Sequence, residues 1–323
     1  MIPFLIVLIV IGGLLILLGL LLLAVDHVFH KTFNRRGDGS NSIIYDHPSD
    51  YPALNIRHGY ISSRKGLRLS YNVYKKDGVK IKATLLVIHG IGFGHYYLLP
   101  MIKKFCNDGY LVIAYDQYGS GASEGKEIET MSVALKDIPY VLNFVKKDEE
   151  LSKYPLYVFG HSWGGYASFS SPRYSKDIKK VVSISGFYNE GVFAHQISFL
   201  VKLRNFFIVG KDAFFDNRKA VKHTDAKMYY LQGENDLVIN PRFAGEKYAK
   251  LAEKCPNLKV ELLPNKGHTP YNDDESQKEQ DKVLGEFGLL GGVLVPIEHY
   301  IDFRKISKVD ENVYQKIIDF YNN

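Results

Sequence analysis

The chain opens with an unbroken apolar stretch from Ile2 to Val25 that contains no charged residue. Roughly 20 apolar residues are enough to cross a bilayer as a helix, so residues 1–25 are predicted to form a transmembrane helix. The competing interpretation is a secretory signal peptide, which needs a basic segment, an apolar core of about 7 to 15 residues and a small-residue cleavage site. No lysine or arginine precedes this longer stretch, and Ala24-Val25-Asp26 is a poor cleavage site. A retained anchor is therefore favoured.

The residues that flank this stretch predict its orientation. Lys31, Arg35 and Arg36 follow it, and positively charged residues favour the cytoplasmic side of a membrane. The two cysteines, Cys106 and Cys255, lie far apart, and the sequence has no Asn-x-Ser/Thr acceptor site, which agrees with a reducing compartment. We expect a single-pass protein of the cell membrane whose larger part is cytoplasmic.

Beyond the helix, the polar and turn-rich residues 26–58 are predicted to be a juxtamembrane tether, and a regular pattern begins at Gly59. Residues 59–75 alternate between apolar and polar as in a β-hairpin. Short apolar runs predict strands at 84–88, 110–115, 156–159, 181–185, 227–231 and 259–263. Segments of helical period alternate with them near 97–107, 131–147, after Ser162, near 242–253 and at the end of the chain. This alternation predicts one α/β domain over 59–323, with a mostly parallel sheet covered by helices on both faces.

Composition narrows the class of protein further. The chain has 323 residues, is 46% hydrophobic and contains ordinary amounts of glycine and proline, which excludes a disordered chain, a collagen-like repeat and a disulfide-stapled miniprotein. The formal net charge of +6 is scattered along the chain and does not form basic runs. A nucleic acid is therefore not expected as a partner.

Candidate chemistry begins at Gly160-His161-Ser162-Trp163-Gly164, which follows a predicted strand and opens a predicted helix. On such a strand-to-helix turn, the hydroxyl of Ser162 is raised above the edge of the sheet, and the glycines permit a strained backbone and close approach of neighbouring chain. A serine becomes a strong nucleophile only when a base takes its proton. The alternative is a plain buried turn serine.

The best candidate for the base is His268, in the loop after the 259–263 strand, and Asp236, after the 227–231 strand, is the carboxylate expected to orient it. A single loop histidine is more often a solvent-exposed residue. The chain order serine, aspartate, histidine, each after a successive late strand, nevertheless matches that of hydrolases with a nucleophile elbow. Glu234 remains an alternative to Asp236, and His223 or His299 an alternative to His268.

A third element is His89-Gly90-Ile91-Gly92, which follows the 84–88 strand. Acyl transfer develops negative charge on the carbonyl oxygen, and two backbone N–H groups aimed at that oxygen stabilise the transition state. The N–H groups of Ile91 and Trp163 are the expected pair. His89 is expected to brace this loop rather than ligate a metal, because no second ligand stands at zinc-like spacing. No metal and no cofactor are expected.

Together these segments resemble a known family. His89 to Gly92, Asp116 to Gly125, Gly160 to Gly164, Gly233 to Asp236 and Gly267-His268 resemble the serine α/β-hydrolases, particularly the monoacylglycerol lipase and lysophospholipase-like branch. The resemblance runs from about Gly59 to the end of the chain. It implies an α/β-hydrolase fold, and it implies that Asp116 and the 119–125 loop shape the site rather than perform chemistry. This chain departs from that branch in its short lid and its N-terminal anchor.

The lid, or cap, is predicted at about 187–222, where the fold accepts insertions between two late strands. It is rich in aromatic residues, interrupted by Lys202, Arg204, Lys211 and Arg218. Such a surface above Ser162 would line a pocket for an acyl chain, and the candidate pocket residues are Phe187, Tyr188, Phe193 and Phe199. The alternative is that these aromatic side chains pack onto the sheet.

The resulting hypothesis is a membrane-anchored serine hydrolase that cleaves carboxylic esters through an acyl-enzyme. Ser162 attacks, His268 moves the proton, Asp236 orients His268, and Ile91 with Trp163 hold the oxyanion. The expected substrates are a monoacyl lipid, a lysophospholipid or a small acyl ester, in that order. Two alternatives stay open. One is a thioesterase or peptidase with the same triad, and the other is a catalytically idle protein of this fold that binds a partner through its cap.

Overall fold

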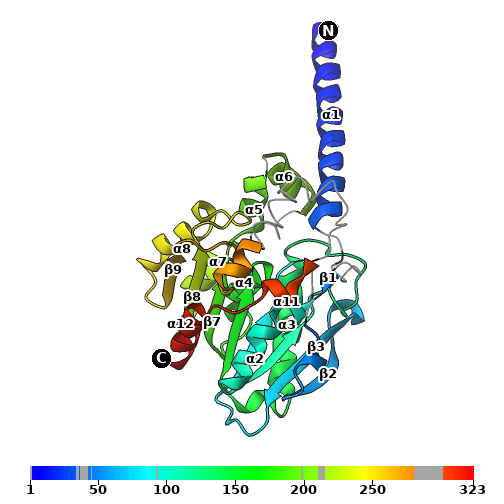
Figure 1. Ribbon diagram of the computed structural model, residues 1–323. Helices are drawn as coiled ribbons and strands as arrows, with labels where there is room; N and C mark the ends of the chain where they lie inside the picture. The colour runs from blue at the N-terminus through cyan, green and yellow to red at the C-terminus, as the bar shows by residue number, and fades with distance from the viewer. Residues whose placement is uncertain are drawn as a thin grey trace.

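A long helix projects from an α/β domain (Figure 1). The computed structural model describes residues 2–33, 36, 43–44, 46–91, 94–197, 199–209, 215–279 and 301–323. The helix is α1 (Ile2–Phe33), and its segment Pro3–Val28 is long and apolar enough to cross a membrane, with a mean hydropathy of 3.3. It extends eight residues past the predicted end at residue 25, because no proline or glycine interrupts the chain between Asp26 and Phe33.

The domain is built on one sheet of eight strands in the order β2-β3-β5-β4-β6-β7-β8-β9. The strands from β5 to β9 in that order run parallel, while β2 and β3 pair antiparallel at one edge. Their bounds are β2 (Leu54–Ser62), β3 (Arg68–Lys76), β4 (Ala83–Ile88), β5 (Tyr110–Tyr115), β6 (Leu156–His161), β7 (Ile178–Ile184), β8 (Lys227–Gly233) and β9 (Leu258–Leu263). The predicted mostly parallel sheet is confirmed. β2 begins at Leu54, inside the segment predicted as tether.

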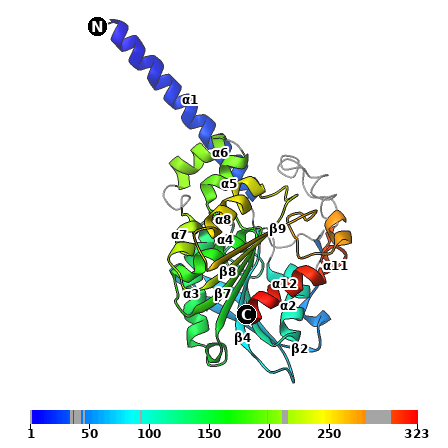
Figure 2. The same ribbon diagram turned by 90° about the vertical axis from the view of Figure 1, so that its left-hand side faces the viewer.

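Helices cover both faces of the sheet (Figures 1 and 2). One face carries α2 (Leu99–Asn107) and α12 (Glu311–Asn322), and the other carries α3 (Val133–Lys147), α4 (Trp163–Ser170) and α8 (Gly245–Ala252). Strand β4 shows why both faces are apolar: Leu85 and Val87 pack with the first group, and Leu86 and Ile88 pack with the second. Alternate residues of a strand point to opposite faces, so an unbroken apolar run predicts a strand that is buried on both sides.

The cap lies between β7 and β8. It comprises α5 (Glu190–Ile197), α6 (Phe199–Arg204), the π-helical segment η6 (Asn205–Val209) and α7 (Asn217–Lys222). In both views α6 lies beside the lower end of α1 (Figures 1 and 2). The remaining elements are β1 (Ile43–Ile44), η1 (Pro48–Asp50), η2 (Arg64–Gly66), η3 (His95–Leu98), η4 (Leu151–Lys153), η5 (Ser171–Arg173), η8 (Pro241–Phe243), β10 (Ile301–Asp302) and α11 (Phe303–Ile306).

Candidate active site

Ser162 occupies a strained turn between β6 and α4. Its backbone has φ 56° and ψ −115°, a conformation that residues other than glycine rarely adopt. Its N–H donates to the carbonyl of Ile184 on the neighbouring strand over 2.8 Å, and its side chain is 7% exposed. Such strain persists only where the surroundings enforce it, and it is concentrated at functional sites. The predicted strand-turn-helix setting of Ser162 is confirmed.

The two glycines that flank this turn are required by close packing. A Cβ on Gly160 would overlap the carbonyl oxygen of Gly164, and a Cβ on Gly164 would overlap the carbonyl oxygen of Ile88 on β4. Both obstacles are backbone atoms, which cannot rotate away as a flexible side chain would. The glycines therefore let the turn sit directly against the end of β4.

Asp236 and His268 are hydrogen-bonded partners. The Nδ1 atom of His268 lies 3.0 Å from both carboxylate oxygens of Asp236. The carboxylate also accepts from the N–H groups of Val238 and Ile239, at 2.9 and 2.8 Å, and from Nε2 of Gln232 at 3.0 Å. Burial alone would raise the pKa of Asp236, but the adjacent His268 and these hydrogen bonds lower it below its usual value. The arrangement maintains an ionised carboxylate behind the imidazole.

The loop that carries His268 is attached to the turn that carries Ser162. His161, the residue before Ser162, has its Nε2 3.0 Å from the backbone carbonyl oxygen of His268, and the two imidazole rings are 4.9 Å apart. In the described part of the chain, no hydrogen bond joins the Ser162 hydroxyl to the His268 ring. Such contacts are often long in the absence of substrate and tighten in the reacting complex.

The hydrogen bonds around His161 determine which of its two ring nitrogens carries the proton. Because a carbonyl can only accept, Nε2 of His161 carries the proton, and Nδ1 accepts from the hydroxyl of Tyr97 at 3.1 Å. The same hydroxyl accepts from the N–H of Gly90 at 2.6 Å. Burial lowers the pKa of His161 to about 3, so its ring stays neutral. A relay thus runs from Gly90 through Tyr97 and His161 to His268.

The loop after β4 adjoins Ser162, as the sequence predicts. A Cβ built on Gly90 would lie 3.3 Å from the Cβ of Ser162. Trp163 begins α4, and the first N–H groups of a helix have no acceptor within the helix. His89 is fully buried; burial lowers its pKa to about 4, and its Nε2 accepts from the N–H of Gln117 at 2.9 Å. It braces the loop by joining it to the chain after β5.

Asp116 performs a similar structural role. It accepts from Nδ1 of His95 at 2.7 Å and from the N–H of Ala122 at 2.9 Å, so it joins η3 to the 119–125 loop. Burial alone would raise the pKa of Asp116, but the charge and hydrogen bond of His95 hold it well below its usual value. Arg36 secures the far side of this loop, donating to the carbonyls of Gly121, Ser123 and Gly125 at 2.5 to 3.0 Å.

Two of the three alternative triad residues lie in the described part of the chain. Glu234 is exposed and His223 follows α7, while His299 lies outside the described residues. Among the residues that the structure describes, no group of three histidine, cysteine or acidic side chains is arranged to hold a metal. Of the candidate carboxylates and bases, the structure therefore brings Asp236 and His268 together.

The predicted pocket residues divide into two groups. Phe187, Tyr188 and Phe193 are buried, and the ring of Phe187 stacks between those of Tyr166 and Phe193, at 4.6 and 5.1 Å. Phe199 is 64% exposed. Three of the four side chains thus pack in the core beneath the cap, and the fourth faces outward.

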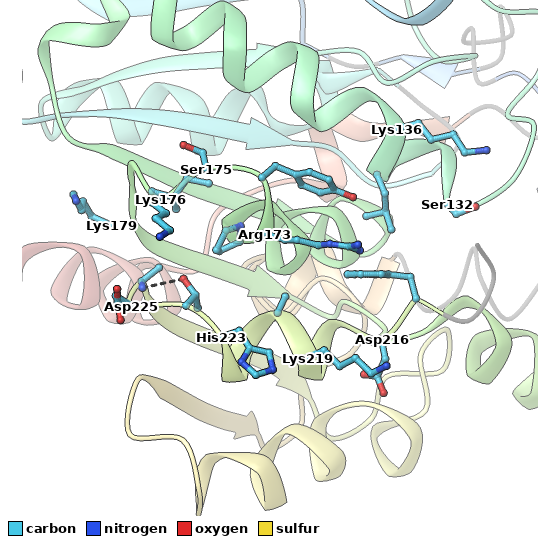
Figure 3. A pocket seen from close by; sticks show the side chains of 18 residues that line it. Ser132, Lys136, Arg173, Ser175, Lys176, Lys179, Asp216, Lys219, His223 and Asp225 are labelled. Atoms are coloured by element: carbon cyan, nitrogen blue, oxygen red, sulfur yellow. Dashed lines mark hydrogen bonds between the residues drawn. The ribbon is translucent and has the colours of Figure 1, made fainter. Parts of the chain in front are cut away.

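A cavity of about 1260 Å³ lies between α3, η5 and α7 (Figure 3). It reaches Ile178 and Ala226, at the amino ends of β7 and β8, whereas Ser162 follows the carboxyl end of β6. None of the predicted catalytic or pocket residues lines it. Its charged lining is mainly basic, with Lys136, Arg173, Lys176, Lys179 and Lys219 against Asp216 and Asp225. This cavity is separate from the serine site.

Comparisons with known proteins agree with this geometry. Residues 79–211 match the family model described as serine aminopeptidase, S33. An esterase from Pyrococcus furiosus superposes with a TM-score of 0.59 at 18% identity, covering 79% of this chain and 97% of that one. The chain has the α/β-hydrolase fold. The resemblance predicted from its motifs is confirmed.

Two curated relatives match this chain over part of their length. A monoglyceride lipase from Rattus norvegicus is 32% identical over 126 residues, which is 38% of this chain and 39% of the lipase. A lysophosphatidylserine lipase from Danio rerio is 25% identical over 209 residues, 59% of this chain and 53% of the relative. The chain thus spans about two fifths to one half of the length of these two relatives.

Several residues of the site were not predicted. Tyr97, Gln232 and Arg36 support the candidate nucleophile, carboxylate and loop, yet they carry no sequence signal of their own. In the sequence, His161 stands out only as part of the Ser162 motif. Its position before the nucleophile is the one signal that marks it as a neighbour of the His268 loop.

Proposed function

We propose that this α/β-hydrolase is a membrane-anchored serine ester hydrolase whose preferred substrate is a monoacyl lipid or lysophospholipid. Its catalytic residues are Ser162, His268 and Asp236, and the N–H groups of Ile91 and Trp163 form the oxyanion hole. The observation that carries the proposal is the Asp236–His268 hydrogen bond of 3.0 Å, in a loop attached to the strained turn of Ser162.

In the proposed reaction, Nε2 of His268 takes the proton of the Ser162 hydroxyl as the oxygen attacks the ester carbonyl. The negative charge that develops on the carbonyl oxygen is stabilised by the two backbone N–H groups. His268 then returns its proton to the leaving alkoxide, which departs as the alcohol. Water attacks the acyl-enzyme in the same way and releases the carboxylic acid and the free serine. Asp236 holds the ring orientation and stabilises the imidazolium.

Two observations support the lipid substrate and the membrane location. The chain has similarity to a monoglyceride lipase and to a lysophosphatidylserine lipase, and Pro3–Val28 is apolar over a length that crosses a bilayer. Lys31, Arg35 and Arg36 after that segment favour a cytoplasmic catalytic domain.

Labelling with a fluorophosphonate probe tests the activated serine. We expect the full chain to be labelled and the label to be lost in Ser162→Ala. Ser185→Ala is the matched control, because Ser185 is also buried with a positive φ, of 51°, at the end of the neighbouring strand β7. Folded protein that is not labelled contradicts the proposal and favours a protein that binds a partner through its cap. Label retained in Ser162→Ala contradicts the assignment of Ser162 as the nucleophile.

The second candidate function is amide hydrolysis, which the name of the matching family, serine aminopeptidase, favours. Turnover of matched esters and amides with the same acyl group separates the two functions. Ester turnover that rises with acyl-chain length supports the lipid substrate. Faster amide turnover, or a preference for short acyl chains, contradicts it.

A further inference from the structure

The carboxyl-terminal part of α1 packs against the cap. Residues 4–11 of α1 have side chains that are 48–68% exposed, but Leu22 is 7% exposed and Val25 packs against the core of the domain. The partner element is α6, which lies beside this end of α1 in both views (Figures 1 and 2). The apolar helix is therefore joined to the cap and not only to the chain that follows it.

An ion pair fixes this contact. Arg204, the last residue of α6, donates from Nε and Nη2 to Oδ1 of Asp26, at 2.7 and 2.6 Å. The side chain of Arg204 is 1% exposed, and its Nη1 donates to Asn205 at 2.7 Å. An arginine is rarely this buried unless it is paired, and a guanidinium that donates twice to a carboxylate has a defined orientation. The pair therefore sets the position of α6 on α1.

The length of α1 determines the depth of this contact in a membrane. The apolar segment Pro3–Val28 has 26 residues, which at about 1.5 Å per residue is roughly 39 Å of helix. The hydrocarbon core of a bilayer is about 30 Å thick. About six residues at one end therefore extend into the headgroup layer. The carboxyl-terminal end is the one that extends, because it carries the charged Asp26. This is also the end of α1 that contacts α6.

The cap presents aromatic side chains at this level. Phe199 begins α6, and Phe206 and Phe207 follow in η6; their side chains are 64, 60 and 62% exposed. Lys202 of α6 and Lys31 of α1 are exposed as well. Large apolar side chains with nearby lysines are typical of surfaces that lie in the headgroup region, where the rings enter the acyl boundary and the ammonium groups contact phosphate.

We propose that α6 and η6 form an interfacial surface that lies in the headgroup layer of the same membrane that α1 spans, held there by the Arg204–Asp26 ion pair. The occupant of this surface is lipid, and the residues that contact it are Phe199, Phe206 and Phe207. The proposal rests on the proposed function only in that α1 spans the membrane. It makes the cap a second point of membrane attachment.

Depth-dependent quenching of a fluorophore in the full-length protein tests this proposal. The native thiols of Cys106 and Cys255 are buried, so unmodified protein serves as the labelling blank. An environment-sensitive fluorophore is attached to Phe199→Cys or Phe207→Cys, and the protein is reconstituted in phosphatidylcholine–phosphatidylglycerol vesicles that contain lipids with a nitroxide near the headgroup. Tyr140→Cys is the matched control, an aromatic residue of α3 that is 40% exposed. Leu8→Cys reports insertion of α1.

Nitroxide lipid is expected to lower the emission at positions 199 and 207 by about twofold or more, as for side chains at the headgroup boundary, and to leave position 140 unchanged. Asp26→Asn and Arg204→Met are expected to abolish this quenching while Leu8→Cys stays quenched, and circular dichroism verifies that each variant is folded. The double variant that exchanges the charges, Asp26→Arg with Arg204→Asp, is expected to restore part of the quenching at positions 199 and 207.

Failure of the two proposals is distinguishable. If Leu8→Cys is not quenched, α1 does not span the membrane, and both are contradicted. If Leu8→Cys is quenched but positions 199 and 207 respond no more than position 140, the interfacial surface alone is contradicted. Quenching that persists in both folded single variants contradicts the role of the ion pair.

Discussion

The imidazole of His161 donates a hydrogen bond to the backbone carbonyl of His268 over 3.0 Å. The residue before the proposed nucleophile therefore holds the loop that carries the proposed base. The hydroxyl of Tyr97 completes the link by donating to the other nitrogen of His161 and accepting from Gly90 in the loop proposed to form the oxyanion hole. Three loops of the candidate site are thus joined by one series of hydrogen bonds.

Removing this relay is expected to reduce catalysis without preventing binding. His161→Phe and Tyr97→Phe are predicted to lower kcat by about ten- to a hundredfold, since a misplacement of about 1 Å can cost roughly a hundredfold. KM for a p-nitrophenyl ester is expected to change little. Tyr271→Phe is the control, because the hydroxyl of Tyr271 contacts the same nitrogen at the longer distance of 3.4 Å. An equal loss in Tyr271→Phe would contradict a specific role for Tyr97.

Substitution of the carboxylate tests which acidic residue orients His268. Asp236→Asn is predicted to lower kcat by about 10³- to 10⁴-fold, because an amide neither holds the correct tautomer nor stabilises the imidazolium. Glu234→Gln, two residues earlier and exposed, is predicted to retain activity within about twofold. Steady-state ester hydrolysis measures both. The opposite ranking would assign the role to Glu234.

The buried carboxyl group of Glu190 predicts a dependence of stability on pH. Burial raises its pKa from 4.5 to about 7, partly offset by Arg204 and by the backbone of Met131 and Ser132. Between about pH 4.5 and 7, the folded state keeps a proton that the unfolded state has released. The free energy of unfolding therefore falls as the pH rises through this range, and the stabilisation is lost once the pH has passed 7. At about 1.4 kcal/mol per pKa unit, the loss is roughly 3 kcal/mol.

Glu190→Gln is accordingly predicted to raise the free energy of unfolding at pH 8 by up to roughly 3 kcal/mol and to have little effect at pH 4.5. Urea denaturation in detergent at the two pH values measures the difference. Glu253→Gln, at an exposed position after α8, serves as the control. A stabilisation of equal size at both pH values would show that the ionisation of Glu190 is not its cause.

The contacts of Arg36 predict that the segment after α1 stabilises the domain. Arg36→Gln removes donors from the carbonyls of Gly121, Ser123 and Gly125, and hydrogen bonds from a charged group contribute about 1.5 to 3 kcal/mol. We expect a loss of about 2 kcal/mol in the free energy of unfolding. Arg304→Gln is the control, since Arg304 is bound to the nearby Asp302 and exposed pairs contribute about 0 to 1 kcal/mol.

Local pattern was sufficient to predict the sheet and the position of Ser162. The inner strands β4 to β8 contain short apolar runs because a strand buried on both faces has no polar side to alternate with. The edge strand β9 instead alternates with Lys259 and Glu261. The turn at Ser162 was predictable because the glycines that permit it lie within two residues of it. The pairing of Asp236 with His268 followed from two strands that are neighbours in both sequence and space.

Contacts between distant segments were not predictable in this way. Tyr97 and His161 are 64 residues apart, and Arg204 and Asp26 are 178 residues apart. No periodicity links such pairs, because their proximity is created by the fold. The cap shows the same limit: its aromatic residues are evident in the sequence, but only tertiary packing separates the buried Phe187 and Phe193 from the exposed Phe199.

Helix α12 has a consequence for the order in which the domain is completed during synthesis. In α12, Ile317 and Tyr321 are buried against the sheet, and the hydroxyl of Tyr321 donates to the carbonyl of Val158 on the central strand β6. One face of the sheet is therefore incomplete until residues 311–322 have left the ribosome, long after α1 has been synthesised. Contacts that span so much of the chain slow folding and expose apolar surface meanwhile. Truncation before Ile317 would leave uncovered the apolar surface of the sheet against which Ile317 and Tyr321 pack.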